Sequence, residues 1–166
     1  NTNVSKLVLD YIAGWEKQIG NKTLAQVGQL PIFRNDDGNG GWLHRPNTIL
    51  VDSEQLESGE VMSDDFKKIA AHEIEEFKAE YRLRFPGRDA ADFTDEDLLR
   101  EVMNTVGKAG KLGEQVKCVV SVSMLTEGWD ANTVTHVLGV LAFGTQLLCE
   151  QVVGRALRRM SYAANE

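Results

Sequence analysis

The chain has 166 residues, of which 42% are hydrophobic and 26% charged, as in one ordinary globular domain rather than a disordered or fibrous protein. A formal net charge of −7 excludes a free-standing nucleic-acid binder with a generally basic surface, so any nucleic-acid contact must be local or shared with another domain. No stretch approaches the roughly 20 apolar residues of a membrane span. Cys118 and Cys149 have neither disulfide nor metal spacing, which predicts buried free thiols and a reducing, cytoplasmic setting.

The first third of the chain predicts one helix, one long irregular segment and one strand. Apolar residues recur at helical spacing from Val4 to Ile19, so we expect a helix over residues 4–19. Residues 20–47 predict an irregular loop or insertion, in which the turn-forming run at residues 35–41 indicates a surface loop or hairpin tip. Residues 48–53 contain a short apolar run after Pro46, bounded by polar residues, and predict a buried strand.

The rest of the chain alternates predicted helices and strands. We expect a long helix over residues 63–85, capped by Ser63 and ended by Pro86-Gly87, and a second helix opened by the capping box of Thr94. A glycine-rich surface loop at 107–113 leads to a strand at 116–122, a polar loop, a strand at 134–140 and a closing helix at about 145–160. This order predicts one α/β domain over residues 1–166, a three-layer RecA-like α/β/α fold with a mainly parallel sheet.

Two weaker signals predict little chemistry. Residues 107–112, Gly-Lys-Ala-Gly-Lys-Leu, have the composition of a phosphate loop, but they lack its glycine spacing and its Ser or Thr, and they precede a strand. A surface loop is therefore the better interpretation. The three histidines, His44, His72 and His136, are too scattered for a zinc motif, and we expect no metal site on this chain.

A more specific pattern links two segments near the C-terminus. Residues 121–130, Ser-Val-Ser-Met-Leu-Thr-Glu-Gly-Trp-Asp, follow the predicted strand at 116–122, and ligands of parallel α/β sheets bind at the carboxyl ends of strands. Residues 151–159, Gln-Val-Val-Gly-Arg-Ala-Leu-Arg-Arg, lie on the closing helix. There Arg155 and Arg158 are three residues apart and share a side of the helix, an arrangement suited to polyphosphate. Gly154 leaves room for a close approach of ligand or backbone.

Each of these residues also has a structural interpretation. Arginine pairs on terminal helices commonly bind carboxylates or water, Asp130 could be a turn or cap residue, and Trp129 could belong to the core. Taken singly, each of these interpretations is favoured. Taken together and in this order, the residues favour a functional site.

The two segments resemble motifs V and VI of superfamily 2 helicases. Glu127-Gly128-Trp129-Asp130 followed by Gln151-x-x-Gly154-Arg155-x-x-Arg158 is similar to the restriction subunits of type III restriction enzymes and related DEAD/DEAH-type helicases. The segment 52–57 resembles motif IV less specifically, so the similarity spans roughly residues 46–160. Val152 departs from the family, because many relatives have an arginine there.

The resemblance implies a role for each matching residue. Gln151, Arg155 and Arg158 would act at the γ-phosphate of ATP, with the two arginines stabilising charge on the transferred group. The resemblance also implies an ATP contact by Asp130, Gly128 and Gly154. It implies a nucleic-acid contact by the segment before them, through Ser121, Ser123, Thr126 and Glu127.

The resemblance also implies what this chain does not contain. No Gly-x-x-x-x-Gly-Lys-Ser/Thr and no Asp-Glu-x-His sequence occurs, so the phosphate loop and the Mg²⁺ ligands are expected on an N-terminal RecA-like domain of a longer chain, of which both ends here look like cuts. The implied function is ATP-driven DNA unwinding or translocation, inactive in the isolated chain. Its implied partners are that domain, DNA and, in a restriction system, a DNA-methylating modification subunit. Alternatives are a catalytically silent RecA-like protein-interaction module and, less favoured, a small doubly wound enzyme with its own site.

Overall fold

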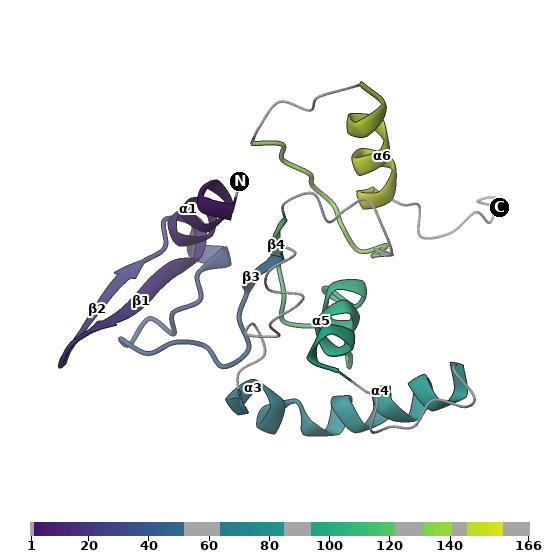
Figure 1. The fold of residues 1–166 in the computed structure, drawn as a ribbon, viewed down its shortest axis with the longest axis horizontal. Coiled ribbons are helices and arrows are strands. Elements are labelled where there is room, and N and C mark those ends of the chain that lie inside the picture. The colour runs from purple at the N-terminus through teal and green to yellow at the C-terminus, as the bar shows by residue number, and fades with distance from the viewer. Residues whose placement is uncertain (1, 52–63, 85–93, 122–130, 141–145, 158–166) are drawn as a thin grey trace.

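The computed structural model describes residues 2–51, 64–84, 94–121, 131–140 and 146–157 (Figure 1). Ten elements follow one another within these ranges. They are α1 (Thr2–Ala13), β1 (Gly14–Ile19), β2 (Lys22–Val27), η1 (Pro31–Phe33), β3 (Thr48–Val51), α3 (Asp64–Ile69), α4 (Ala71–Arg84), α5 (Asp95–Asn104), β4 (Cys118–Ser121) and α6 (Gln146–Ala156). The predicted cap Ser63 and the predicted stop at Pro86-Gly87 lie outside the described residues.

The predicted helix over residues 4–19 is wrong in its second half, because α1 ends at Ala13 and β1 begins at Gly14. Gly14 has φ +86°, a left-handed conformation that glycine adopts without strain. A Cβ on Gly14 would lie 2.7 Å from the Gly28 amide nitrogen, so the backbone also approaches too closely for a side chain. The apolar residues Trp15 and Ile19 fit helical spacing and strand alternation equally well.

The expected irregular segment 20–47 contains β2, which pairs antiparallel with β1 from Gly14↔Val27 to Ile19↔Lys22. The remainder is tied to the start of β3. Asn35 accepts from the Thr48 amide at 2.9 Å and donates to the Thr48 carbonyl at 2.8 Å, and Asn47 donates to the Arg34 carbonyl at 2.7 Å. The predicted hairpin tip at 35–41 is present, closed by a bridge between Asp36 and Trp42. In this irregular segment, side-chain hydrogen bonds to the backbone therefore take the place of a backbone hydrogen-bond ladder.

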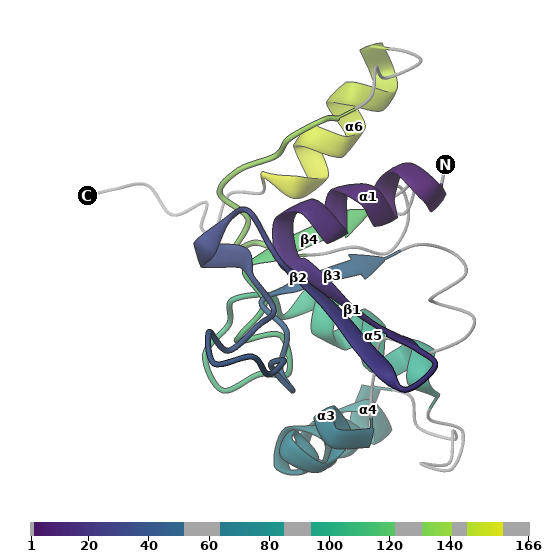
Figure 2. The same cartoon turned by 90° about the vertical axis from the view of Figure 1, so that its left-hand side faces the viewer.

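A parallel pair of strands lies at the centre of the fold, as predicted. β3 and β4 pair from Thr48↔Cys118 to Val51↔Ser121. Ile49 and Val51 belong to the buried cluster that also contains residues of α4 and α5. Figures 1 and 2 show α1 on one side of this pair and α5 on the other. The protein is thus a mixed α/β chain with a parallel pair, while half of its described strands form an antiparallel hairpin rather than a mainly parallel sheet.

The predicted long helix at 63–85 consists of two helices, because α3 ends at Ile69 and α4 begins at Ala71. The Arg45 guanidinium lies at the break, donating to the Ile69 carbonyl at 3.1 Å and to Glu73 at 2.8 Å. Ala70, fully buried at the junction, accepts from the Ile74 amide at 2.9 Å. A side chain from the loop before β3 therefore donates to a helix carbonyl at the break.

Helix α5 begins as predicted at a capping box, in which Thr94 accepts from the Asp97 amide and Asp97 accepts from the Thr94 amide. Its apolar side is the most buried surface in the described chain, with Leu98, Leu99 and Val102 at 1% exposure or less. These side chains pack with Phe77 and Tyr81 of α4, whose rings meet edge to face at 5.9 Å. The core therefore lies between α4, α5 and one face of β3.

The strand predicted at residues 134–140 is wrong, because this segment is irregular throughout. Val134 and Val137 pack against the core, whereas Leu138 and Val140 are exposed. A spacing of three between the packed valines does not fit a strand, in which every second residue shares a face. The strand predicted at 116–122 is present as β4 from Cys118 to Ser121, whereas residues 116 and 117 precede it without strand pairing. The predicted closing helix at about 145–160 is present as α6, which ends at Ala156.

Candidate functional site

The carboxyl edge of the parallel pair is where the sequence predicts a site. Because β3 and β4 are in parallel register, Val51 and Ser121 end side by side at this edge. The chain segments that resemble motif IV and motif V leave from these two residues. The segments themselves, and with them Ser123, Thr126, Glu127, Gly128, Trp129 and Asp130, lie outside the described residues.

Ser121, the one predicted nucleic-acid contact that the structure describes, ends β4. Its Oγ is buried and has no hydrogen-bond partner in the described part of the chain, and the same holds for Asn132 Oδ1. Buried hydroxyl and amide groups are normally satisfied, and leaving one unpaired costs about 1–3 kcal/mol. The two residues flank the segment 122–130 in the sequence, so both of its ends carry unused hydrogen-bonding capacity. The sequence pattern did not single out Asn132.

Helix α6 carries the described part of the second segment. Gln151 and Gly154 are exposed, whereas Val152 is 8% exposed and faces the protein. Arg155 belongs to the same helix and follows Gln151 by four residues, about one turn. Arg158 lies outside the described residues. α6 stands to one side of the β3–β4 pair in both views (Figures 1 and 2).

Gly154 has no structural reason for being glycine within the described chain. A Cβ built on it meets nothing within 4 Å, and its φ is not positive. Glycine inside a helix costs about 1 kcal/mol relative to alanine. The space beside Gly154 is open, and no described residue approaches it closely.

The glycine-rich loop after α5 was the weaker candidate for phosphate binding. Its three glycine amides are already engaged: Gly107 donates to the Gly113 carbonyl at 2.9 Å, Gly110 donates to Glu114 at 2.9 Å and Gly113 donates to the Thr105 hydroxyl at 3.0 Å. Lys111 pairs with Glu80 at 2.8 Å, and this hydrogen bond raises the pKa of Lys111 above its ordinary value. The loop therefore closes on itself, which supports the surface-loop interpretation over a phosphate cradle.

Cys118 and Cys149, predicted to be buried free thiols, are free but only half buried. Burial raises the pKa of the Cys118 thiol, and a hydrogen bond with Thr48 opposes this shift in part. A raised pKa lowers the fraction of reactive thiolate, which disfavours Cys118 as a nucleophile. Within the described ranges, no three side chains of His, Cys, Asp or Glu gather as metal ligands.

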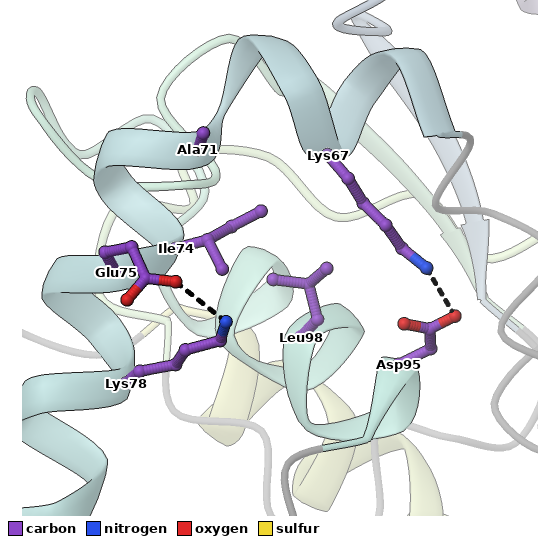
Figure 3. Close-up of a pocket in the computed structure, with 7 residues that line it drawn as sticks. All are labelled: Lys67, Ala71, Ile74, Glu75, Lys78, Asp95 and Leu98. Carbon is purple, nitrogen blue, oxygen red and sulfur yellow. Dashed lines mark hydrogen bonds and ion pairs between the residues drawn. The ribbon is translucent and has the colours of Figure 1, made fainter. Parts of the chain in front are cut away.

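A pocket that the sequence did not predict lies between α3, α4 and α5 (Figure 3). Its volume is about 290 Å³, and its apolar wall is formed by Ala71, Ile74 and Leu98. All four charged side chains around it form ion pairs, Lys67–Asp95 at 2.7 Å and Lys78–Glu75 at 2.8 Å. Because these charges are neutralised within the pocket, it offers no obvious recognition group, and we interpret it as a packing cleft between helices.

No protein-family model, curated protein or solved structure matches this chain. In the described part of the chain, no helix combines the length and the hydropathy that crossing a bilayer requires.

Proposed function

We propose that this chain is the second RecA-like domain of an ATP-dependent DNA helicase or translocase, related to the restriction subunits of type III restriction enzymes. One observation carries the proposal: Glu127-Gly-Trp-Asp130 and Gln151-x-x-Gly154-Arg155-x-x-Arg158 follow each other in the order and spacing of motifs V and VI. The three-layer RecA-like fold, with helices on both faces of a larger parallel sheet, is part of this proposal.

Two features of the fold support it. The first segment leaves the carboxyl edge of a parallel strand, the edge at which α/β proteins bind their ligands. The second segment begins on the exposed side of α6, where Gln151 and the open space at Gly154 are accessible to another domain. A site shared across a domain cleft requires such exposure.

The proposed chemistry divides the site between two domains. Arg155 and Arg158 stabilise the charge that develops on the γ-phosphoryl group, Gln151 lies near that group, and Asp130 contacts the ribose or the arginines. Guanidinium groups fit a polyphosphate, whereas the described residues contain no cluster of Mg²⁺ ligands. In this proposal ATP is the shared substrate, and the first RecA-like domain supplies the residues that hold Mg²⁺.

The competing function is a silent RecA-like module that binds another protein. Leu147 on α6 and Leu157, directly after the end of α6, support it, because they are 63% and 46% exposed and could pack against a partner. Such a module does not require Gln151, Arg155 and Arg158 together. Substituting Arg155 or Arg158 therefore distinguishes the two functions.

The test replaces Arg155 or Arg158 with alanine in a protein that carries both RecA-like domains. We expect the ATPase rate to fall by about 10³–10⁵, as for the loss of an arginine finger, and the melting temperature to stay unchanged. Lysine should rescue poorly, because it lacks the bidentate fork. Arg100→Ala, which removes an exposed arginine paired with Glu96 on α5, is the matched control and should leave the rate unchanged.

A normal ATPase rate per folded molecule in Arg155→Ala would refute the assignment and favour the interaction module. The 166-residue chain alone should not hydrolyse ATP, because it contains no phosphate loop. Turnover by the purified chain that Arg155→Ala abolishes would show that the site is not shared.

A further inference from the structure

The β1–β2 hairpin, residues 14–27, forms an arm that projects from the end of α1 and away from the core (Figures 1 and 2). Every residue of β2 is exposed, as are the last four residues of β1. An isolated two-stranded hairpin is marginally stable in water. An arm of this kind is therefore expected to have a binding partner.

One face of the arm has a distinct chemistry. Cross-strand neighbours and alternate residues of a strand share a face, so three pairs define this one: Trp15↔Gln26, Lys17↔Leu24 and Ile19↔Lys22. The face carries two lysines and no carboxylate, although the whole chain has a net charge of −7. Glu16 lies on the opposite face, by the same alternation. The arm thus presents a local positive face on an acidic protein.

The lysines of this face are available. Both are exposed, and neither forms an ion pair within the ranges that the structure describes. The Lys17 ammonium lies 5.2 Å from the centroid of the Trp15 ring. Ile19 and Leu24 are 61% and 47% exposed. Each cation therefore has an apolar neighbour across or along the strand, and the face alternates positive and apolar groups.

We propose that this face binds a single strand of nucleic acid, with Lys17 and Lys22 on phosphates and Trp15, Ile19 and Leu24 against unstacked bases. A single strand presents both anionic phosphates and flat apolar bases, and proteins bind it through basic surfaces combined with aromatic platforms. A duplex keeps its bases stacked inside, so it would meet the lysines and leave the apolar groups unused.

The size of the face disfavours a protein partner. Two six-residue strands at about 3.4 Å per residue and about 4.8 Å apart cover roughly 20 Å by 10 Å, or about 200 Å². A stable protein interface needs about 800 Å² on each side. The face is large enough only for a few nucleotides. This inference deepens the proposed function and rests on it, because it adds a contact to the strand that the motor would hold.

The test measures the anisotropy of a labelled oligothymidylate titrated with the 166-residue chain. Binding should be weak, detectable at about 50 mM salt and largely lost near 150 mM, because phosphate contacts dominate it. Lys17→Gln with Lys22→Gln should weaken binding at least tenfold. The matched control, Gln18→Glu with Thr23→Glu, changes the net charge by the same −2 on the opposite face and should weaken binding far less. Trp15→Ala should also cost about tenfold.

Several outcomes would overturn the proposal: no binding by the wild-type chain at low salt, equal losses in the two double variants, or equal affinity for duplex. A change in oligomeric state caused by the lysine variant would assign the face to a protein interface instead. Arg100→Ala, which removes one positive charge from α5, should leave strand binding by the isolated chain unchanged. The arm is tested by strand binding of this chain, whereas the arginines are tested by the ATPase rate of the larger protein. The arm and the motor assignment can therefore fail separately.

Discussion

The core between α4, α5 and β3 and the two peripheral elements, the β1–β2 arm and α6, are built from the same apolar residue types. In the core, Leu98, Leu99 and Val51 are 1% exposed or less. At the periphery, Ile19, Leu24 and Leu147 are between 47% and 63% exposed. Composition therefore does not separate the regions; what separates them is whether a second element of this chain covers the apolar side.

This difference in burial separates the residues that stabilise the fold from the elements that are proposed to bind ligands or take part in catalysis. Burial in the core supplies the favourable free energy of folding, since apolar surface contributes about 25 cal/mol for each Å² removed from water. The arm contributes little in this way, and so do the described side chains of α6 apart from Val152; both functional proposals concern these two elements. If the division is right, substitutions in the core should change the free energy of unfolding, and substitutions at the periphery should change binding or catalysis.

The largest effect on stability is expected from Leu99→Ala, because Leu99 is fully buried in α5. The lost burial and the cavity should lower the free energy of unfolding by about 2–5 kcal/mol. The matched control is Leu147→Ala, because Leu147 is also a helical leucine but is 63% exposed. This substitution should change the free energy of unfolding by less than about 0.5 kcal/mol. Urea denaturation followed by circular dichroism measures both. Equal losses would show that α6 is packed as tightly as the core.

A smaller loss is expected from Gly113→Ala. A Cβ there would collide with the Val102 carbonyl oxygen and lie 2.7 Å from the carbonyl carbon of Thr105, which are backbone atoms that cannot rotate away. Overpacking of this kind costs about 1–3 kcal/mol. The measurement is the shift in the denaturation midpoint. A variant as stable as the wild type would show that the loop after α5 moves freely, contrary to its hydrogen bonds.

Glu73→Gln tests the clamp that holds the loop before β3 against the α3–α4 break. The hydrogen bond from Arg45 lowers the pKa of Glu73, so the stabilisation is fully present above the ordinary carboxyl pKa of about 4.3 and is lost as pH falls through the lowered value. We expect a loss of about 1–2 kcal/mol at pH 7 that disappears in strong acid. Denaturation of both proteins at several pH values measures it; a difference that persists at pH 2 would contradict the charge-based explanation.

The sequence predicted those elements whose local signals have one interpretation. The capping box at Thr94, the apolar run of β3 and the glycine-rich loop after α5 were found because capping chemistry, β-branched runs and glycine clusters act locally. The order of helices and strands indicated the α/β class, and the parallel pair at its centre agrees with it.

The failures have physical causes as well. Trp15 and Ile19 satisfy both helical and strand spacing, so only the backbone of Gly14 decides between them. At the break between α3 and α4, the Ile69 carbonyl accepts a hydrogen bond from Arg45, which is 24 residues away in sequence, so no local pattern indicates this contact. For the candidate site, the sequence located Ser121, Gln151 and Gly154 on a strand end and an exposed helix. It could not reveal the unpaired Asn132 or the arm, because both depend on tertiary surroundings.

The smallest expected effect, and the one that joins the two regions, is that of Gly154→Ala. In the part of the 166-residue chain that the structure describes, the new methyl group meets nothing within 4 Å, so helix propensity is the main change, and the free energy of unfolding should rise by up to about 1 kcal/mol. A stabilising substitution raises the question of why glycine occupies this position. If α6 faces ATP across a domain cleft, the methyl group fills the space that the ligand or the other domain uses. The same variant should then lower the ATPase rate of the protein that carries both RecA-like domains.

The two effects of Gly154→Ala are measured separately, each against the wild type. Denaturation of the chain gives the change in the free energy of unfolding, and steady-state ATPase of the larger protein gives the change in rate. Stabilisation with undiminished ATPase would mean that nothing approaches Gly154 closely, and the assignment of α6 to the ATP site would lose one of its supports.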